Sequence, residues 1–239
     1  MLKHPKRAVI LAGGKGMRLR PYTTVFPKPL MPLGDKPILE IVVQQLKAVG
    51  IEHITFAVGY LAELIQAFFG QGEKWGLTID YSREVEPMGT AGPLKQIAQL
   101  EQDFLVMNGD ILCNLDYLEM YEYHLSHGAI ASIGTFQKEV KIDLGVLELD
   151  QDQVTAYIEK PVLNYPVSMG IYYFKPEILD WIPANQALDL PDLILKLIAA
   201  GATPRAYLFD GTWLDIGRES DYSQAQDYFE QHQDLFLKP

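Results

Sequence analysis

The sequence predicts an α/β protein with a mainly parallel sheet and helices on both of its faces. Short apolar runs typical of buried strands alternate with segments of helical periodicity from the N-terminus to about residue 136. A glycine-rich segment follows the first apolar run, and turn residues separate the later ones. Because a helix that follows a strand returns the chain to the same end of the sheet, this alternation favours parallel strand pairs.

The elements before residue 136 follow one another in a regular order. Apolar runs predict strands at residues 8–11, 54–58, 77–81, 104–107 and 129–135. Periodic apolar positions predict helices at residues 38–49, 61–69, 91–98 and 115–127. Pro37 and Pro93 are tolerated at helix starts, and Gly50 and Gly70 mark helix ends.

The pattern changes after residue 136. Two short apolar runs, separated by the turn residues 150–153, predict a hairpin of residues 145–149 and 154–158. Further elements are predicted as strands at residues 169–174 and 205–209 and as helices at residues 190–200 and 220–232. No linker or repeat interrupts the chain, so we expect one domain in which the residues after about 136 form the half that faces the substrate.

The composition is that of a globular protein, with 48% apolar and 21% charged residues. A net charge of −11 argues against a nucleic-acid-binding surface, which needs a basic footprint. The single cysteine, Cys113, excludes an intrachain disulfide and suits a reducing compartment. No apolar run approaches the length of a membrane span, and the run after the basic N-terminus is too short for a signal peptide. We therefore expect a cytoplasmic protein.

Residues 9–18 carry the strongest chemical signal in the chain. Three glycines surround Lys15 between residues 13 and 16, which lets backbone N–H groups approach a phosphate closely. Arg18 and Lys28, the latter between two prolines, are cations suited to phosphate oxygens. The spacing matches neither a Walker A loop nor the dinucleotide-binding glycine pattern. The segment predicts a polyphosphate-binding loop at the end of the first strand, and a strand-to-helix turn without a ligand is the alternative.

Residues 11–19, together with residues 27–32, resemble the signature of the sugar-1-phosphate nucleotidyltransferases, or NDP-sugar pyrophosphorylases. Later motifs of that family follow in the expected order, namely Gly89-Thr90-Ala91-Gly92, Asn108-Gly109-Asp110, Glu159-Lys160-Pro161, Gly170-Ile171-Tyr172 and Trp213-Leu214-Asp215-Ile216-Gly217. The chain is similar to mannose-1-phosphate guanylyltransferases and glucose-1-phosphate thymidylyltransferases over nearly its whole length. This resemblance implies a three-layer α/β/α, Rossmann-like fold with a mixed, mainly parallel sheet. It also implies a nucleotide-binding half at residues 1–136 and a sugar-phosphate-binding half at residues 137–239.

The resemblance implies that a sugar-1-phosphate attacks the α-phosphate of a nucleoside triphosphate, releasing pyrophosphate and forming an NDP-sugar. Both reactants are anionic, so catalysis depends on positioning and on neutralising charge. Arg18 is implied to grip the β- and γ-phosphates and Lys28 the α-phosphate, with Asp110 as the third catalytic residue. The implied nucleotide-binding residues are Leu11, Ala12, Gly13, Gly14, Lys15, Gly16, Met17, Arg18, Glu84, Gly89 and Thr90.

Asp110 and Asp215 are the candidate ligands of a Mg²⁺ ion. Each follows an apolar run in a glycine-containing turn. Two carboxylates and phosphate oxygens form the hard-oxygen site that Mg²⁺ prefers, and such an ion would screen the α-phosphate and orient both substrates. Taken alone, Asn108-Gly109-Asp110 is more often an ordinary turn, and Asp215 alone could cap a helix. The combination of the two motifs favours the metal site.

The sugar phosphate is implied to bind at Glu159-Lys160-Pro161. Lys160 would contact its phosphate and Glu159 would accept hydrogen bonds from sugar hydroxyls, with glycine backbone close to the ring. The implied sugar-phosphate-binding residues are Gly145, Glu159, Lys160, Ser168 and Gly170. A charged pair before a proline is also common on protein surfaces, which is the alternative for this motif.

Two positions depart from the family pattern. Met17 stands where threonine is usual, so a hydroxyl that could touch phosphate is lost. Ser168 stands where asparagine is frequent, so a contact to a sugar hydroxyl is shortened. The effect of both changes on turnover and on the choice of sugar stays open.

Glu84 lies five residues before Gly89, where the family places a residue against the base. A carboxylate only accepts hydrogen bonds, and guanine offers N1–H and N2–H₂ as adjacent donors. This favours GTP, with mannose-1-phosphate or a related hexose or heptose phosphate. UTP or dTTP with glucose-1-phosphate is the alternative, because some uridylyl-transferring relatives also carry glutamate here.

Two other classes of protein compete with this hypothesis. A regulatory or ligand-sensing paralogue would be expected to lose some of the four charged residues Arg18, Lys28, Asp110 and Asp215, and all are present. A glycosyltransferase would usually show an Asp-x-Asp pair, which is absent at residues 110–112. The sequence shows no hexapeptide repeats, so we expect no acyltransferase activity. The expected partners are two small-molecule substrates, with no nucleic acid or membrane, and a homo-oligomer is left open.

Overall fold

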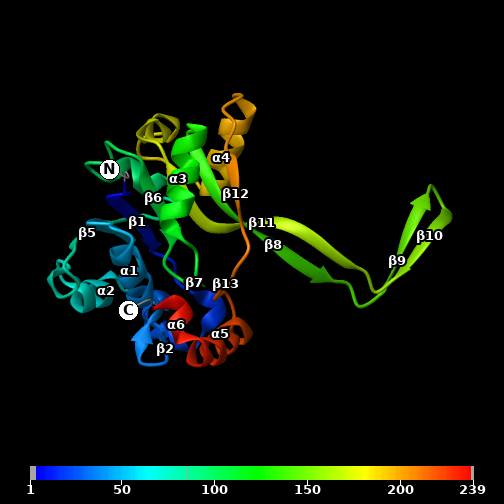
Figure 1. Cartoon of the computed structure of the whole chain (residues 1–239), viewed down its shortest axis with the longest axis horizontal. Coiled ribbons are helices and arrows are strands. Elements are labelled where there is room, and N and C mark those ends of the chain that lie inside the picture. The colour runs from blue at the N-terminus through cyan, green and yellow to red at the C-terminus, as the bar shows by residue number, and fades with distance from the viewer. Residues whose placement is uncertain (1–3, 85, 238–239) are drawn as a thin grey trace.

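A seven-stranded sheet forms the centre of the computed structural model, which describes residues 4–84 and 86–237 (Figure 1). Its strands lie in the order β12-β8-β11-β6-β1-β4-β5. The bounds are β1 Arg7–Ala12, β4 His53–Val58, β5 Thr78–Arg83, β6 Phe104–Asn108, β8 Ala131–Lys141, β11 Val162–Phe174 and β12 Arg205–Phe209. Parallel pairs join β1 to β4 and β6, β4 to β5, and β8 to β12, whereas β11 is antiparallel to its neighbours β6 and β8. The expected α/β fold with a mixed, mainly parallel sheet is confirmed.

Helices cover both faces of this sheet, because successive side chains of a strand point to opposite faces. Ile10 of β1 belongs to the apolar cluster that contains the buried sides of α1, α2 and α3. Its neighbour Val9 belongs to the cluster on the other face, with Leu193 and Leu197 of α4. The helices span α1 Ile38–Ala48, α2 Ala62–Phe69, α3 Tyr117–His127, α4 Leu190–Ala199, α5 Glu219–Gln231 and α6 Gln233–Phe236. A third cluster joins α5 to the residues around η3 (Lys28–Leu30).

Two short antiparallel ladders lie outside the central sheet, and the sequence patterns do not predict them. β2 (Pro32–Leu33) pairs with β3 (Lys36–Pro37), and β7 (Ile111–Cys113) pairs with β13 (Trp213–Asp215). Three or fewer residues per strand are too few for a recognisable period, which is why the sequence shows no signal. The second ladder brings together two motifs that lie about 100 residues apart in the chain.

The prediction of a helix at residues 91–98 is wrong. The segment forms only a 3₁₀ turn, η5, from Gly92 to Gln96. The backbone N–H groups of Ala91 and Gly92 both donate to the carbonyl of Leu188, at 2.8 and 3.1 Å. These hydrogen bonds to the segment before α4 use the backbone N–H groups at the start of the turn. Pro93 has no N–H group to donate a further bond.

Strands β8 and β11 extend far beyond the predicted residues 129–135 and 169–174. Their outer parts pair with each other and leave the body of the molecule as a ribbon, as Figure 1 shows. The hairpin of β9 (Gly145–Asp150) and β10 (Gln153–Glu159), which was predicted, lies at the end of this ribbon. We call residues 137–167 the arm. Its strands were missed because their apolar residues are scattered among exposed polar ones.

Across residues 4–84 and 86–237, no helix combines the length and the apolar composition that crossing a bilayer requires. The division of the chain into two functional halves at residue 136 stays a prediction. The residues after 136 are not confined to the arm, because β12, α5 and α6 return to the body.

Candidate functional site

The glycine-rich loop leaves β1 at its carboxyl end, the edge of an open α/β sheet at which ligands bind. Gly16 has a φ of 58°, which lies in the left-handed region that favours glycine. A Cβ atom at Gly16 would lie 2.8 Å from Cγ2 of Thr23. Oγ1 of Thr23 donates to the carbonyl of Gly16 at 2.8 Å. Glycine at this position therefore allows the loop to pack against its own returning segment.

This loop forms one wall of a cavity of about 250 Å³. Its lining residues are Leu11, Ala12, Gly14, Gly16, Met17, Arg18, Lys28, Pro29, Asp110 and Gly217. The cavity brings together the three predicted catalytic residues from separate segments of the chain. Gly13 and Lys15 flank it, and Lys15 is exposed to solvent. Met17, the residue that replaces threonine, is 54% exposed at its mouth.

Lys28 and Asp110 form an ion pair inside this cavity, through Nζ and Oδ2. Lys28 is only 8% exposed and lies in η3 between two buried prolines, which limits the movement of its backbone. The other carboxylate oxygen of Asp110, Oδ1, is buried and accepts no hydrogen bond from the described residues. A buried acceptor without a partner is costly, so this atom indicates where a cation or a donor group would bind.

Asp215 lies beside Asp110 because β7 and β13 pair with Asp215 opposite Ile111. Burial raises the pKa of Asp215, and the carboxylate of Asp110 raises it further. Lys28 and Arg18 oppose this shift. The motif at residues 108–110 and the motif at residues 213–217 therefore meet as the sequence predicts.

The two carboxylates fit a Mg²⁺ ion better than a metal held by the protein alone. Within the described part of the chain, no three His, Cys, Asp or Glu side chains form a metal-binding group. Mg²⁺ is commonly bound through one or two carboxylates and completes its octahedron with water and phosphate oxygens. The unpartnered Oδ1 of Asp110 is suited to such a contact.

A second cavity of about 380 Å³ adjoins the first one and shares Arg18 and Gly217 with it. Its lining residues are Arg18, Phe136, Lys138, Trp213, Leu214, Asp215, Gly217, Arg218, Asp221 and Gln224. Two of its cations, Lys138 and Arg218, are functional candidates that sequence reasoning missed. Arg218 directly follows the motif at residues 213–217, which could have revealed it, whereas no sequence signal points to Lys138.

Glu84, the residue predicted to contact the base, lies against the glycine loop. Its Oε1 lies 3.5 Å from the position that a Cβ atom on Gly13 would occupy. Its Oε2 accepts a hydrogen bond from the backbone N–H of Met88 at 2.8 Å. Burial raises the pKa of Glu84, and the bond from Met88 opposes this shift. The carboxylate is therefore held in place, with lone pairs left to accept from a ligand.

Gly89 and Thr90 have clear structural roles in this arrangement. Gly89 has a φ of 75°, and a Cβ there would lie 2.5 Å from the carbonyl oxygen of Leu188. The Thr90 hydroxyl donates to Asp189 at 3.2 Å and accepts from the N–H of Leu190 at 2.7 Å. These contacts fasten the loop before η5 to the start of α4.

Ser168 and Gly170 lie at the base of the arm, next to the end of β6. A Cβ atom on Gly170 would lie 2.6 Å from Nδ2 of Asn108, so the strand passes close to the motif that carries Asp110. Ser168 Oγ accepts from the Gly170 N–H at 3.2 Å and lies 3.0 Å from the Tyr172 hydroxyl. Both residues are thus near the cavities.

Gly145, Glu159 and Lys160 are not brought to the cavities of their own chain. Gly145 and Glu159 form the first pair of the β9–β10 hairpin and Lys160 follows at the turn into β11, so all three lie where the ribbon of β8 and β11 meets the hairpin. The ring of Tyr157 packs over Gly145, and its hydroxyl donates to Oε2 of Glu159 at 3.1 Å. Lys160 is exposed and has a φ of 45° at the turn from β10 into β11. Their role in binding sugar phosphate stays a prediction. In this conformation, the three residues cannot contact a ligand in the cavities of their own chain.

Comparison with known proteins connects this geometry to one family. The family model described as "Nucleotidyl transferase" matches residues 7–232. A UTP–glucose-1-phosphate uridylyltransferase of Synechocystis sp. is 37% identical over 240 residues, which cover 92% of this chain and 62% of that protein. Mannose-1-phosphate guanylyltransferase 1 of Arabidopsis thaliana is 35% identical over 226 residues, with 90% of this chain and 62% of the relative covered. The chain thus spans about three fifths of the length of these curated relatives.

Solved structures agree on the fold. A putative glucose-1-phosphate thymidylyltransferase from Bacillus anthracis has a TM-score of 0.75 at 22% identity, covering 93% of this chain and 94% of that one. HddC from Yersinia pseudotuberculosis, complexed with GMP-PN, has a TM-score of 0.69 at 26% identity, covering 94% of this chain and 99% of that one.

Proposed function

Because the chain belongs to the nucleotidyl transferase family, we propose that it condenses a nucleoside triphosphate with a sugar-1-phosphate to form an NDP-sugar and pyrophosphate. One observation carries the proposal: Arg18, Lys28, Asp110 and Asp215 converge at the carboxyl end of β1. They come from four separate segments, and each belongs to a motif that resembles the family signature.

The charges of this site suit a transfer between two anions. In the proposed reaction, an oxygen of the sugar phosphate forms a bond to the α-phosphorus while the bond to the bridging oxygen of the β-phosphate breaks. Arg18 would hold the departing β- and γ-phosphates with its planar guanidinium, and Lys28 would neutralise charge at the α-phosphate as a compact ammonium. The ion pair with Asp110 holds the Lys28 ammonium in one position before substrate arrives.

Asp110 and Asp215 would hold a Mg²⁺ ion as part of this proposal. When bound, the ion would lower the negative charge of the phosphates and orient them. Asp110 itself also holds the Lys28 ammonium in place through their ion pair.

For the base we propose guanine, and for the acceptor mannose-1-phosphate or a related hexose or heptose phosphate. The constrained carboxylate of Glu84 beside the glycine loop supports this choice, because guanine presents two adjacent donors to it. UTP or dTTP with glucose-1-phosphate remains the alternative, since the similar proteins include both guanylyl- and uridylyltransferases. A cytoplasmic location completes the proposal, supported by the buried free thiol of Cys113.

A substrate matrix tests this proposal. Pyrophosphate release would be measured with GTP, UTP, dTTP, CTP and ATP, each paired with mannose-1-phosphate and glucose-1-phosphate in the presence of Mg²⁺. We expect the highest kcat/KM for GTP with mannose-1-phosphate. A preference for UTP or dTTP would overturn the assignment of the base, and no release with any pair would overturn the activity.

A further inference from the structure

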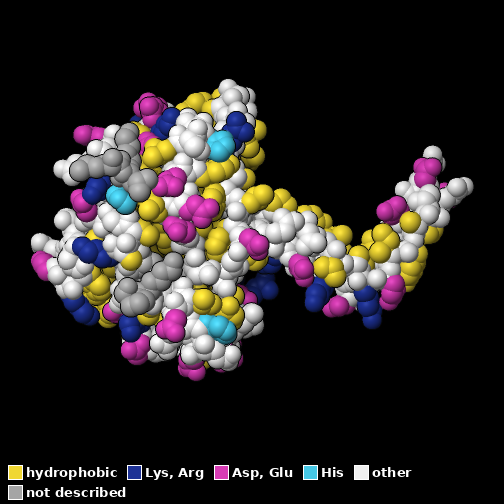
Figure 2. Space-filling model, viewed as in Figure 1, with side chains coloured by type: hydrophobic (Ala, Val, Ile, Leu, Met, Phe, Trp, Pro, Cys, Tyr) yellow, Lys and Arg dark blue, Asp and Glu magenta, His cyan; other side chains and the backbone are white. Residues whose placement is uncertain are grey.

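The arm exposes apolar side chains on a segment that has no core of its own. None of residues 137–167, all of which the structure describes, is buried. Leu144 is 73% exposed and Tyr157 65%, and Figure 2 shows hydrophobic side chains along the ribbon and over the hairpin at its end. Monomeric proteins rarely leave a continuous apolar surface uncovered, so the arm has the composition of an interaction surface.

The register of the hairpin collects these side chains on one face. Tyr157 pairs with Leu147, and Val154 pairs with Leu149, so each pair points to the same side. Glu159 lies two residues after Tyr157 and accepts its hydroxyl hydrogen bond, so its carboxylate borders this hairpin face. A two-stranded hairpin alone is only marginally stable in water. Its stability increases when another surface covers its apolar face.

The ribbon keeps the hairpin away from the body that carries it. Residue pairs run without interruption from Thr135 opposite Ser168 to Lys141 opposite Val162. At about 3.3 Å per residue, Val162 lies about 20 Å along the strand from Ser168 at the base of the arm. Glu159 and Lys160 lie beyond Val162, so they cannot reach Arg18 or Asp215 of their own chain without bending this ladder.

The body, in turn, carries the second cavity, which has both apolar and charged lining residues. The second cavity adjoins the Arg18 side of the triphosphate site. Phe136, Trp213 and Leu214 give it an apolar wall, and the rings of Phe136 and Trp213 lie 5.4 Å apart. Its charged lining residues are the cations Arg18, Lys138 and Arg218 and the carboxylates Asp215 and Asp221.

We propose that the arm of one copy docks into a second copy of this chain and supplies Glu159 and Lys160 to that copy's site. The hairpin face packs against the apolar wall of the second cavity, and the exchange is reciprocal about a two-fold axis. Charge complementarity supports this occupant: residues 142–161 carry five carboxylates and one lysine, whereas the cavity lining carries three cations and two carboxylates. The inference rests on the proposed function for the role of Lys160, but not for the docking itself.

The docking is tested first without any activity measurement. Sedimentation analysis should give a dimer for the wild type and a monomer for Leu147→Asp/Tyr157→Asp. The matched control is Ile198→Asp, which changes an exposed apolar residue of α4 outside both cavities and should remain dimeric. A photo-crosslinking residue in place of Tyr157, in a mixture of ¹⁵N-labelled and unlabelled chains, should yield mixed-isotope products that join position 157 to the segment at residues 213–218.

Complementation then tests whether the site is shared. Arg18→Ala disables the body of one chain and Lys160→Ala disables the arm of the other, and each variant alone should be inactive. Co-expressed in equal amounts, they should recover about a quarter of wild-type activity, since about half of the dimers are mixed and each mixed dimer has one intact site.

These measurements separate the two proposals. A monomeric wild type, crosslinks within one chain only, or activity no higher than that of the separate variants would overturn arm exchange. A crosslinked dimer that releases no pyrophosphate with any substrate pair would overturn the proposed function while leaving the docking intact.

Discussion

Lys28 illustrates how a single residue acquires its role from its surroundings. Two flanking prolines and η3 fix its backbone, burial strips its ammonium of water, and Asp110 supplies the compensating charge. The prolines and the lysine are visible in the sequence, so the candidate itself could be predicted. The partner could not, because the pairing depends on how β1 and β6 lie side by side.

Asp110→Asn is expected to lower the free energy of unfolding by about 1–3 kcal/mol, because it leaves the Lys28 ammonium buried without its counter-charge. Lys28→Met/Asp110→Asn should recover part of this loss, since both charged partners are then removed. Denaturant titration would measure both. In the exposed pair of Lys36 and Asp35, Asp35→Asn should change stability by less than about 0.5 kcal/mol. Equal losses at the two pairs would contradict the buried role of Lys28.

Glu84→Gln is expected to shift the choice of base. Glutamine both donates and accepts, so it suits uracil or thymine better than the two adjacent donors of guanine. The ratio of kcat/KM for GTP to that for UTP should fall by about 10-fold or more, since one lost hydrogen bond to a charged group is worth about 1.5–3 kcal/mol. Glu86→Gln, an exposed neighbour, should leave the ratio unchanged. An unaltered ratio for Glu84→Gln would mean that this side chain does not read the base.

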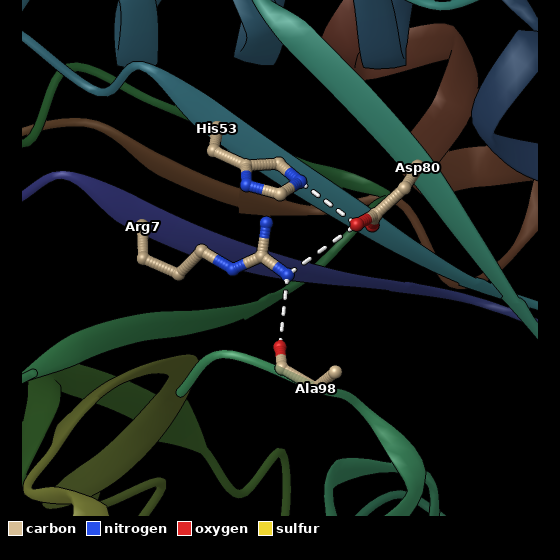
Figure 3. Close-up of polar contacts among 4 residues, drawn as sticks. All are labelled: Arg7, His53, Asp80 and Ala98. Carbon is tan, nitrogen blue, oxygen red and sulfur yellow. Dashed lines mark hydrogen bonds and ion pairs between the residues drawn. The ribbon is translucent and has the colours of Figure 1, made fainter. Parts of the chain in front are cut away.

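At the scale of elements, the amino ends of β1, β4 and β5 are held together by a buried arginine. Figure 3 shows Arg7 between Asp80 and the carbonyl of Ala98, with His53 beside Arg7 and directed at the same oxygen of Asp80. Arg7 Nη2 lies 3.5 Å from Asp80 Oδ2, and its Nε and Nη1 are buried without partners among the described residues. Burial lowers the pKa of Arg7, and Asp80 opposes that shift. This cluster lies at the edge of the sheet opposite the cavities.

Asp80→Asn should therefore destabilise the fold by about 1–3 kcal/mol without altering KM, because it removes the carboxylate that pairs with Arg7. Arg7→Met/Asp80→Asn should be more stable than Asp80→Asn alone, since no unpaired charge stays buried. Thermal unfolding measures both, with the exposed Glu101→Gln as the control. If the single and double variants were equally stable, Arg7 would not depend on Asp80.

We expect His124 of α3 to make the stability of the fold depend on pH. It is fully buried, its Nδ1 lies 2.8 Å from Ser132 Oγ, and its Nε2 lies 3.7 Å from Asp103. Burial and the nearby charge of Lys175 lower the pKa of His124 to about 4. In the unfolded chain the imidazole takes up a proton near pH 6.5, so stability should fall as the pH drops from 6.5 towards 4, by up to about 3 kcal/mol. Above pH 6.5 this group should have no effect.

Unfolding of the wild type and of His124→Asn across this pH range would measure that contribution. The difference in stability between the two proteins should shrink steadily below pH 6.5. Parallel curves would show that the pKa of His124 is the same in the folded and the unfolded state. The ring resonances of His124 should independently report a pKa near 4.

The elements also show why the sequence predicts some helices and strands correctly and others not. Strands β1, β4 and β6 are buried on both faces, so they appear as continuous apolar runs. The outer parts of β8 and β11 are exposed on both faces and give no such run. The segment at residues 91–98 has helical periodicity, but tertiary hydrogen bonds to Leu188 take its first donors.

For the whole molecule, the order of the motifs along the chain predicts only part of their arrangement in space. Motif order predicts that Asp110 and Asp215 meet, and the β7–β13 ladder brings them together. The same logic predicts that Glu159 and Lys160 join them, yet the continuous ladder of the arm holds these residues apart. Strand length beyond the body depends on which exposed residues pair, and exposed positions carry little sequence signal. Under the proposed function, one chain therefore presents the triphosphate half of a site, and the residues proposed to bind the acceptor lie where the ribbon meets the hairpin.

The central claim is that the cavity around Arg18 binds the triphosphate. Steady-state pyrophosphate release by Arg18→Ala, compared with the wild type and with Arg20→Ala, tests it most directly. Both arginines are exposed, but only Arg18 lines the cavity, so both variants should keep the wild-type melting temperature. We expect Arg18→Ala to lower kcat/KM by about 100-fold or more, whereas Arg20→Ala should stay within about 2-fold of the wild type. Near-wild-type turnover by Arg18→Ala, or an equal loss in both variants, would contradict the claim.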